Sequence, residues 1–372
     1  MKQIRFEAFG SPSLVAKYVD VPAVGAPSAW EVVVEVEAFP INVADLAMLA
    51  GRYGTLPKPP ATIGMEAVGR IIETGTSVKN LQTGDRVVLL ANHNWSEHRR
   101  VPAAAVHKIP ADADPLQFAM LKVNPATAAM LLQDFATLQE GDWVIQTAPL
   151  SSVGQCVLQI ARHKSLRTIN IVRSAAAIPE VIERGGDIAI LDGPDLAARL
   201  RERIGHDSVM LALDAVAGPG IDSLAECLSD DGQIVNYGML SSLPCQLNAN
   251  HTIFRGITLK GFWLSRVLNR LSQPERTKLF DSLGEMLMSG KLKLSVDSCF
   301  PMSSIGDALR RAEQSGRSGK VIVQPVSCFA LAQSAPSLRG GTARVGDTSN
   351  NDATMRNSEH DTKPQMYGTQ SC

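Results

Sequence analysis

The segment from Trp143 to Arg173 constrains the fold of this chain more than any other stretch. It begins with the apolar run Trp143–Ala148 and passes through a turn of small residues at 149–154. It continues into residues 155–164, where apolar side chains recur at helical spacing, and then into a second apolar run, Thr168–Val172. This order predicts a strand, a turn, a helix and a strand, the minimal half of a doubly wound dinucleotide-binding fold.

The turn itself is an imperfect version of a glycine-rich phosphate-binding fingerprint. A helix that begins near Ser151 would direct unpaired backbone N–H groups, and the positive end of its dipole, toward the turn. An anionic pyrophosphate fits such a site. However, serine stands at 151 and 152, and only Gly154 remains of the glycines. Taken alone, the turn therefore predicts either a dinucleotide site or another strand–helix–strand crossover.

Arg173, at the end of the second predicted strand, bears on the choice of cofactor. An unphosphorylated ribose is held by an acidic residue about 20 positions past the glycines, whereas a 2′-phosphate is held by a guanidinium. The strand end reads Val172-Arg173-Ser174, without an acid. This favours NADPH over NADH. The alternative is that Arg173 is a solvated charge at a strand end.

Length and composition bound the class of protein. The chain has 372 residues, enough for two domains, and a formal net charge of −1 from well-mixed charges, so we expect neither nucleic acid nor a membrane surface as partner. Its six scattered cysteines form neither a disulfide framework nor a zinc-ribbon spacing, which indicates a reducing compartment. The first residues enter a strand pattern at once, leaving no room for a signal or transit peptide. We therefore expect a cytoplasmic protein.

The chain divides into three patterns. Residues 1 to about 120 predict a β-rich region, and a helix then opens at Asn124-Pro125 and runs through Ala136. Next comes strand and helix alternation, which implies a parallel sheet covered on both faces. The tail from about Gln333 is polar and aperiodic, and we expect it to be disordered. The β-rich region contains strands at 4–8, 31–38, 67–74 and 86–90.

The alternating region and the segment after it contain the remaining predicted elements. By the general rule for open α/β sheets, residues 214–217 and 237–240, just past two of these strands, are expected near the cofactor. The segment after Phe262 is expected to return to the first domain. The predicted strands are 143–148, 168–172, 188–191, 209–214, 233–237 and 257–262, with helices at 195–204 and 221–228, then a helix at 274–289, a strand region at 292–300, a helix at 304–315 and a strand at 320–326.

Several collinear motifs resemble the medium-chain dehydrogenase/reductase superfamily, and within it the zinc-free, NADPH-dependent 2-enoyl thioester reductases of the mitochondrial type. The most specific are Gly51-Arg-Tyr-Gly54, Asn124-Pro-Ala-Thr127 and Gly261-Phe-Trp-Leu-Ser265. The resemblance covers residues 1–326. Supporting motifs are Pro40-Ile-Asn-Val-Ala-Asp45, Gly64-Met-Glu-Ala-Val-Gly69, Gly84-Asp85, Asp142-Trp-Val-Ile-Gln146, Val153-Gly-Gln155, Thr168-Ile-Asn-Ile-Val-Arg173, Tyr237-Gly238 and Ser318-Gly-Lys320.

This resemblance implies an α/β fold in which a doubly wound parallel Rossmann sheet is joined to a GroES-like, mainly β catalytic domain. It implies a catalytic domain formed by residues 1–121 and 265–327, with the NADPH-binding domain at 122–264 between them. Residues 328–372 are expected to be a disordered tail. The relatives are commonly dimers through edge pairing in the nucleotide domain, so a homodimer is expected by resemblance.

The resemblance also addresses metal binding. Zinc-dependent members place a cysteine where Asn42 stands, a histidine where Met65 stands, and a four-cysteine lobe between the strands. Residues 85–121 contain no cysteine, and a tetrahedral zinc site needs its nitrogen and sulfur ligands, so we expect no metal. His93, His98 and His107 match no helix face, and we interpret them as loop and surface residues.

The implied reaction is conjugate reduction of a carbon–carbon double bond next to a thioester. Hydride from NADPH is added to the β-carbon, and the resulting enolate takes a proton at the α-carbon. The family match makes Tyr53 the acid, because a phenol stays protonated at neutral pH and can still protonate a basic enolate. Asn42 is a possible donor and Trp95 a possible wall of the cleft. A half-exposed loop tyrosine, a capping asparagine and a core tryptophan are the alternatives.

The cofactor positions carried over by resemblance follow the nucleotide from end to end. Two departures from the family pattern stand among them: Ser152 replaces a glycine, and Ala175 replaces a second arginine. Both are expected to weaken cofactor binding or its selectivity. The positions are Asn124 and Thr127 on the nicotinamide side; Leu150, Ser151, Ser152 and Val153 over the pyrophosphate; Arg173, Ser174 and Ala175 at the 2′-phosphate; Tyr237, Gly238, Met239 and Leu240 beside the ribose; and Phe262, Trp263, Leu264 and Lys320.

Two other functions remain open at this point. Zinc-free relatives on the same fold reduce quinones or other enones by the same hydride path. A non-catalytic NADPH-binding protein is the third reading, suggested by Ser152 and Ala175. Neither the acyl chain length nor the carrier, coenzyme A or acyl carrier protein, follows from the sequence.

Overall fold

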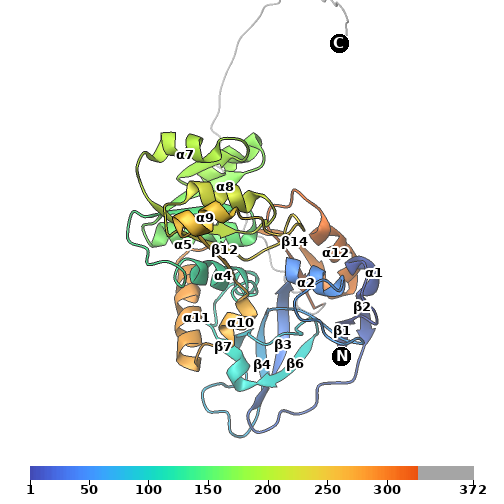
Figure 1. Cartoon of the computed structure of the whole chain (residues 1–372). Coiled ribbons are helices and arrows are strands. Elements are labelled where there is room, and N and C mark those ends of the chain that lie inside the picture. The colour runs from blue at the N-terminus through green and yellow to red at the C-terminus, as the bar shows by residue number, and fades with distance from the viewer. Residues whose placement is uncertain (326–372) are drawn as a thin grey trace, which may run out of the picture. The chain divides into compact units, whose positions relative to one another are not determined.

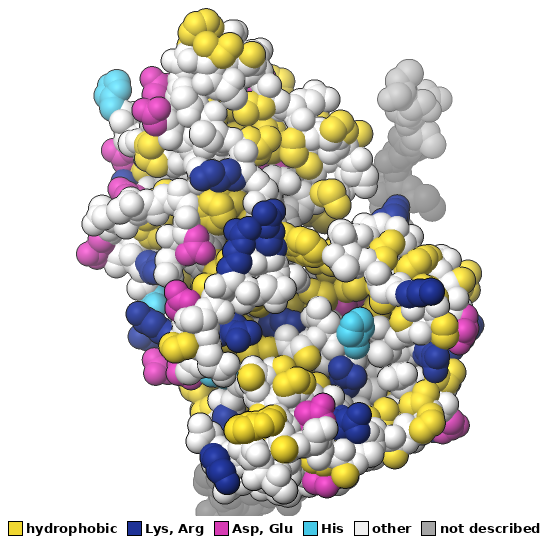
Figure 2. Space-filling model, turned by 60° about the horizontal axis from the view of Figure 1, so that its bottom comes forward, with side chains coloured by type: hydrophobic (Ala, Val, Ile, Leu, Met, Phe, Trp, Pro, Cys, Tyr) yellow, Lys and Arg dark blue, Asp and Glu magenta, His cyan; other side chains and the backbone are white. Residues whose placement is uncertain are grey.

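The computed structural model describes residues 1–325, which fall within one compact unit. The predicted disordered tail, 328–372, lies outside the described residues. Within the described part, every helix is too short or too polar to cross a membrane. On the face shown in Figure 2, basic, acidic and hydrophobic side chains are interspersed, in keeping with the mixed charge of the sequence.

A six-stranded parallel sheet occupies the middle of the chain. Its strand order is β10-β9-β8-β11-β12-β13, so the order reverses between β8 and its neighbour β11, where ligands of such sheets bind. The predicted fold class is confirmed, and each of the six strands lies within a residue of its predicted ends. The bounds are β8 Trp143–Thr147, β9 Arg167–Val172, β10 Ile188–Leu191, β11 Val209–Asp214, β12 Gln233–Asn236 and β13 Thr258–Gly261.

Helices accompany this sheet, and two of them frame the site. α5 (Ser152–His163) follows β8, and its apolar side chains Val157, Ile160 and Ala161 are buried. α4 (Asn124–Leu131) packs against α5. It ends five residues before the predicted Ala136, because the N–H groups of Gln133 and Asp134 both turn back to the carbonyl of Met130. The others are α6 Ile178–Glu183, α7 Leu196–Ile204, α8 Gly220–Cys227, α9 Ala249–Arg255, α10 Leu264–Leu268 and α11 Gln273–Met288.

A mixed sheet is built from the beginning and the end of the described chain. Its order is β14-β15-β3-β4-β5-β7, and β6 pairs with β3. The sequence pattern missed β2, β6 and β7, which are three to five residues long and partly polar. β1 (Lys2–Arg5) and β2 (Lys17–Asp20) form a separate antiparallel pair. The strands of the mixed sheet are β3 Glu31–Pro40, β4 Ala67–Thr74, β5 Arg86–Leu89, β6 His98–Pro102, β7 Val106–Lys108, β14 Val296–Pro301 and β15 Lys320–Gln324.

The last strands return to this first sheet, as the sequence predicted. β15 pairs antiparallel with β3, with Val323 opposite Phe39. Helix α12 (Ile305–Glu313) contacts α1 (Pro12–Val15), and Figure 1 shows the orange α12 beside the blue α1. This return brings Lys320, at the start of β15, next to residues that begin the chain. The remaining short helices are α2 Val43–Leu49 and α3 Pro115–Phe118.

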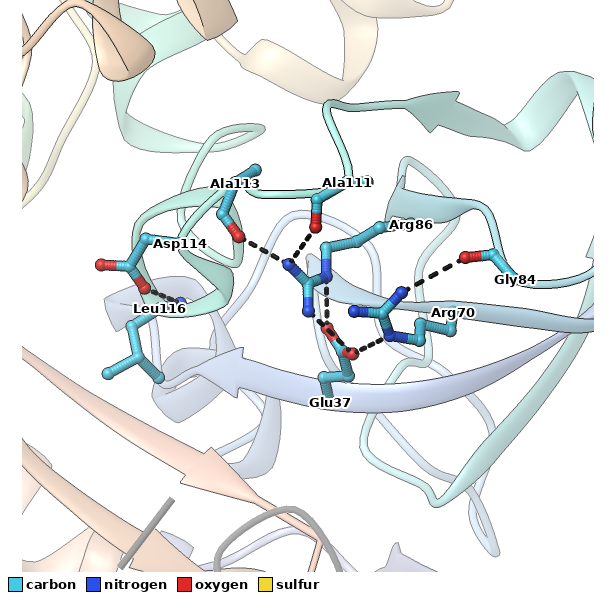
Figure 3. A network of polar contacts seen from close by, with 8 residues as sticks. All are labelled: Glu37, Arg70, Gly84, Arg86, Ala111, Ala113, Asp114 and Leu116. Carbon is cyan, nitrogen blue, oxygen red and sulfur yellow. Dashed lines mark hydrogen bonds and ion pairs between the residues drawn. The ribbon is translucent and has the colours of Figure 1, made fainter. Parts of the chain in front are cut away.

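An ion-pair network fastens the strands of the mixed sheet (Figure 3). Glu37 on β3 pairs with Arg70 on β4 and with Arg86 on β5, at 2.8 and 2.9 Å. Arg86 also donates to the carbonyls of Ala111 and Ala113, at 3.0 and 2.7 Å. The network therefore ties three adjacent strands to the loop before α3.

Candidate functional site

The turn between β8 and α5 contains one residue with a strained backbone and one position that is packed too closely for any side chain. Ala148 adopts a left-handed φ of 49°. The Ser151 hydroxyl accepts a hydrogen bond from the N–H of Gly154 at 3.1 Å and caps α5. A Cβ on Gly154 would lie 2.5 Å from the carbonyl oxygen of Ala148 and 2.6 Å from that of Pro149. This close packing explains why Gly154 remains although serine stands at 151 and 152.

The first turn of α5 leaves backbone donors available. Among the described residues, the N–H groups of Ser152 and Val153 have no hydrogen-bond acceptor. They lie at the positive end of a 12-residue helix. Ser152 also lines a narrow cavity of about 10 Å³ together with Asn124 and Lys320. The arrangement fits an anionic phosphate group, so the residues present fit a dinucleotide cofactor at its pyrophosphate.

Asn42 lies at the centre of a buried polar network beside this cavity. Its side-chain Nδ2 donates to Oε1 of Glu66 at 2.9 Å, and its Oδ1 accepts from Nζ of Lys320 at 2.6 Å. The side chain of Asn124 is 3.4 Å from the same oxygen. The second carboxylate oxygen of Glu66 accepts from the N–H of Val123 at 2.8 Å. The network joins α2, β15 and α4 through buried hydrogen bonds.

Asp45 and Lys122 extend the network on its other side. Asp45 accepts from the backbone N–H groups of Asn42 and Met65, at 2.9 and 3.1 Å. Lys122 donates to the carbonyl of Met65 at 2.5 Å and to Asn92 at 3.0 Å. Both side chains are buried. The buried carboxylates and ammonium groups therefore act on one another electrostatically, while their hydrogen bonds go to backbone groups and amides.

Burial shifts the pKa of each ionisable group in this network. It raises the pKa of Asp45 to about 7 and also raises the pKa of Glu66. It lowers the pKa of Lys122 and of Lys320 to about 8, although the nearby carboxylates act in the opposite direction. Since charged and neutral forms are both accessible near neutral pH, the network can change its proton content there.

The same network tests whether zinc fits the position that the resemblance pointed to. Asn42 and Met65 stand where zinc-dependent members of the superfamily place ligands, and they offer an amide and a thioether. Two lysines, Lys122 and Lys320, lie near enough to the carboxylates of Glu66 and Asp45 to act on them electrostatically, while their ammonium groups donate to the carbonyl of Met65 and to Asn42. The network offers carboxylates but neither an imidazole nor a thiolate, and the ammonium groups of Lys122 and Lys320 nearby disfavour a dication, so it does not fit a tetrahedral zinc site.

Tyr53 and Trp263 meet although they are far apart in the sequence. The indole N–H of Trp263 donates to the Tyr53 hydroxyl at 2.9 Å, and the rings lie edge to face with centroids 6.0 Å apart. Tyr53 is half-buried, and burial raises the pKa of its hydroxyl. A Cβ on Gly54 would lie 3.7 Å from the Trp263 ring. The structure thus brings a neutral phenol against the segment that follows β13.

Trp95 lies in the core of the mixed sheet and not along a cleft. Its side chain has no solvent exposure and stacks on Phe39, with centroids 5.5 Å apart. A Cβ on Gly64 would lie 2.4 Å from its ring. Trp95 therefore does not form a wall of the cleft, because its ring is packed closely on both sides.

On the ribose side, buried polar groups shape the loops after β11 and β12. Asp214 accepts from Thr147 at 2.9 Å, from Asn236 at 2.7 Å and from the N–H of Ala217 at 2.8 Å. The hydroxyl of Tyr237 is buried beside the Ser151 side chain but forms no hydrogen bond of good geometry with a described residue. A buried hydroxyl without a hydrogen bond destabilises the fold unless a ligand or a water molecule forms a hydrogen bond with it.

The other predicted cofactor residues divide by exposure. Arg173, Ser174 and Ala175 are exposed after β9, with the Ser174 hydroxyl accepting from the N–H of Ala176 at 3.3 Å. Met239 and Leu240 are also exposed. The half-buried members are Leu150, Val153 and Gly238, and the buried ones are Thr127, Phe262 and Leu264.

The sequence reasoning missed Asp45, Glu66 and Lys122 as site residues. Two of them lay inside the quoted motifs, and Glu66 stands between apolar neighbours in Ile63-Gly-Met-Glu-Ala-Val68. The sequence did contain a sign of this role: an acidic residue stands in a run that otherwise predicts a buried strand. A buried carboxylate needs hydrogen-bond partners, which indicates a polar site.

The three histidines correct another expectation. His93 is an exposed loop residue, as predicted. His98 instead begins β6. His107 lies in β7 with its side chain only 11% exposed, 3.3 Å from a carboxylate oxygen of Asp281. Both were misplaced because strands this short carry too little periodicity to be read.

One further group of side chains comes close enough to consider a metal. Donor atoms of Asp222, Glu226 and His251 lie within 4.8 Å of one another. Arg255, however, lies 3.1 Å from Nδ1 of His251 and can only donate there. The neutral ring then carries its proton on Nε2, which faces Asp222 at 3.6 Å. The group is better described as a polar contact between α8 and α9, in which Arg255 occupies one ring nitrogen of His251, than as a metal site.

Comparison with known protein families matches both parts of the chain. Residues 28–111 match the alcohol dehydrogenase GroES-like domain, and residues 185–323 match the zinc-binding dehydrogenase family. The enoyl-[acyl-carrier-protein] reductase of Dictyostelium discoideum is 31% identical over 330 residues, 87% of this chain and 94% of the relative. The rat enzyme of the same name is 36% identical over 287 residues, 75% and 77% of the two chains.

Solved structures share the fold. An NADPH:quinone reductase described from Bacillus thuringiensis has a TM-score of 0.80 at 25% identity, covering 87% of this chain and 98% of its own. A complex of Etr1p with NADP and crotonyl-CoA has a TM-score of 0.77 at 21% identity, covering 87% and 99%. The mitochondrial 2-enoyl thioester reductase of Candida tropicalis, at the same score and identity, is a heterodimer.

The curated relatives correct the expected location. The enoyl-[acyl-carrier-protein] reductases of Dictyostelium discoideum, mouse and human that match this chain are all mitochondrial. The expectation of a cytoplasmic protein is therefore wrong. It rested on the strand pattern of the first residues, which predicts local structure but does not determine subcellular location.

Proposed function

Because the chain belongs to the mitochondrial enoyl-[acyl-carrier-protein] reductases, within the medium-chain dehydrogenases/reductases, we propose that it reduces the C2=C3 double bond of trans-2-enoyl thioesters with NADPH. The bound cofactor supplies the hydride for the β-carbon. The protein must then hold the thioester, stabilise the charge on its oxygen and protonate the α-carbon.

The observation that carries this proposal is the contact between Tyr53 and Trp263, with 2.9 Å between the hydroxyl and the indole nitrogen. The bond orients the phenol, and the raised pKa keeps it protonated at neutral pH. A neutral phenol is a proton donor suited to an enolate, which is a stronger base than the phenolate left behind. In this proposal Tyr53 is the acid and Trp263 positions it.

For the cofactor, the free N–H groups of Ser152 and Val153 bind the pyrophosphate, and Lys320, across the narrow cavity that Ser152 also lines, adds positive charge nearby. The unpaired hydroxyl of Tyr237 supports a ligand beside it. Arg173, exposed and without an acidic neighbour in sequence, binds the 2′-phosphate. Ala175 leaves Arg173 alone there, so selectivity for NADPH over NADH is expected to be modest.

Asn42 has a different role in this proposal from that of a free donor to the thioester oxygen. Both ends of its amide are occupied, by Glu66 and by Lys320. It therefore orders the buried network behind the cavity. The same network supports the proposal that the enzyme reduces its substrate without zinc, since the donor atoms of the network do not fit the metal.

A comparison of acceptors tests the proposal. Purified enzyme with NADPH should consume the cofactor with crotonyl-CoA and release butyryl-CoA. Fast consumption with a quinone and none with crotonyl-CoA would favour the quinone reductase alternative, which the 25% identical fold neighbour supports. Consumption with neither acceptor, with NADPH binding intact by calorimetry, would indicate a non-catalytic NADPH-binding protein.

A homodimer is the assembly that the parallel sheet supports. β13 is an edge strand whose four residues are all exposed. Beside it in sequence, α9 carries Ile253 and Phe254 with 69% and 77% of their surface exposed. An open edge with apolar neighbours invites pairing with a second copy.

A further inference from the structure

A groove on the surface of the parallel-sheet region is lined by positive charge. It lies between one face of α5 and the segment 290–295, is open to solvent and has a volume of about 540 Å³. Among its described lining residues there is no aspartate or glutamate. Its basic side chains are Arg162, His163, Arg184, Lys291 and Lys293.

Specific hydrogen bonds build this groove. Gln159 on α5 accepts from the N–H of Lys293 at 2.8 Å and donates to its carbonyl at 3.1 Å. Gln155, one turn earlier, accepts from Ser295 at 3.2 Å. Two glutamines thus hold the 290–295 segment against the helix, and Lys293 is anchored through both of its backbone groups.

The charges of the groove are unevenly compensated. Arg184 is paired with Glu180 at 2.8 Å and donates to Gln155 at 3.0 Å. In contrast, the side chains of Arg162, Lys291 and Lys293 make no ion pair or hydrogen bond with any described residue. Three cationic groups therefore face one concavity without a carboxylate to neutralise them, which favours an anionic ligand.

The backbone makes room for one of these cations. Gly185 has a φ of 97°, and a Cβ at this position would lie 1.9 Å from Nη2 of Arg162. Any other residue would displace the guanidinium. The glycine lets Arg162 lie against the chain at the wall of the groove while its donors stay free.

The groove adjoins the narrow cavity that Ser152, Asn124 and Lys320 line. Gln155, Lys293 and Ser295 line both the groove and the narrow cavity that reaches Ser152 and Lys320. A ligand in the groove would contact the wall that also bounds the proposed pyrophosphate site. The two sites are separate, because the connecting cavity, at about 10 Å³, has room for about one water molecule.

We propose that this groove binds a small organic anion carrying two or more phosphates. Its volume is in the range of small-molecule sites, and separated cations suit several phosphates better than one carboxylate. The proposal does not depend on the proposed reaction. Two sources share this chemistry: the nucleotide portion of coenzyme A and a free nucleotide such as ATP.

Calorimetry with inorganic tripolyphosphate tests the groove. The full chain is titrated in the presence of saturating NADPH, so that the site at Ser152 and Val153 is filled. We expect saturable binding that weakens with added salt. The double variant Lys291→Gln/Lys293→Gln should weaken it by at least about tenfold, since both charge-assisted hydrogen bonds to the anion are lost. Lys278→Gln, an exposed lysine of α11 outside the groove, should bind like the parent.

Absence of saturable binding overturns the proposal, and so does equal weakening by Lys278→Gln. Competition then identifies the source. Displacement of tripolyphosphate by coenzyme A, with a raised KM for crotonyl-CoA in the double variant, assigns the groove to the substrate's nucleotide. Displacement by ATP alone assigns it to a free nucleotide. The same titration without NADPH tests whether the groove binds tripolyphosphate even if the enzyme reduces no enoyl thioester.

Discussion

At the residue scale, the site depends on buried polar side chains that satisfy one another. Glu66 accepts from Asn42 and from the backbone of Val123, and Lys320 donates to Asn42. Each partner is costly to bury alone, because a charge without compensation loses its hydration. The orientation of Asn42 and the position of Lys320 therefore depend on Glu66, which touches neither cofactor nor substrate in the proposal.

Replacing Glu66 by glutamine tests this dependence. The change removes the carboxylate that acts most strongly on the buried ammonium groups of Lys122 and Lys320 and leaves only Asp45 near them, so we expect the free energy of unfolding to fall by about 3 to 5 kcal/mol. Denaturant unfolding measures it. Glu73→Gln, on the exposed end of β4, is the matched control and should change stability by less than about 0.5 kcal/mol. Equal stability of Glu66→Gln and the parent would contradict the account.

Asp45 makes stability depend on pH in a defined window. Burial raises the folded-state pKa of Asp45 to about 7, above the ordinary value of 3.8, so the folded state binds the proton more tightly than the unfolded state. This contribution to stability is complete below about pH 4 and is lost as the pH rises to about 7. Asp45→Asn should therefore show a flatter decline between these values, measured as unfolding free energy against pH. A parallel decline in both proteins would argue against a shifted Asp45.

The residues of the site were predictable to different degrees. Tyr53 and Trp263 were both named, but the sequence could not place one against the other, since 210 positions separate them. Trp95 was assigned to the cleft and lies in the core, because a tryptophan in a loop pattern gives no sign of which side it faces. Asp45 and Lys122 escaped notice because their partners are backbone groups and side chains brought together by folding.

At the element scale, the turn into α5 combines helix capping with close backbone packing. Ser151 caps the helix, and Gly154 lets the turn pack against the carbonyls of Ala148 and Pro149. The strands around it were read well from sequence because β8, β9 and β11 are buried along nearly their whole length and therefore form long apolar runs. Short polar elements such as β6 and β7 were not, since five and three residues contain too little periodicity to indicate a strand.

Gly154→Ala tests the turn. A Cβ there would approach two carbonyl oxygens to 2.5 and 2.6 Å, so the turn must shift and the free N–H groups lose their alignment. We expect NADPH affinity, measured by calorimetry, to fall by about tenfold or more. Gly220→Ala at the start of α8, where nothing lies within 4 Å of the added carbon, should leave affinity unchanged. Unaltered binding by Gly154→Ala would show that the turn does not hold the cofactor.

At the scale of the whole molecule, the chain closes on itself. β15 pairs with β3, and this pairing carries Lys320 into the network around Asn42. Assembly is the next level, and the exposed edge of β13 with Ile253 and Phe254 supports a homodimer.

Phe254→Asp tests that assembly. Phe254 is 77% exposed in the single chain, so the change should leave the fold intact, as seen by circular dichroism, but place a charge in an apolar interface. We expect light scattering coupled to gel filtration to report a dimer for the parent and a monomer for the variant. A parent that is monomeric at every concentration would refute the dimer.

The central claim is that Tyr53 protonates the α-carbon of an enoyl thioester during reduction with NADPH. The most direct measurement compares Tyr53→Phe with the parent, following NADPH consumption and butyryl-CoA formation from crotonyl-CoA, with Tyr18→Phe on β2 as the control. The account predicts that Tyr53→Phe lowers kcat by about 10²- to 10⁴-fold, keeps its affinity for NADPH, and that Tyr18→Phe behaves like the parent. A Tyr53→Phe enzyme that forms butyryl-CoA at the parent's rate would contradict it.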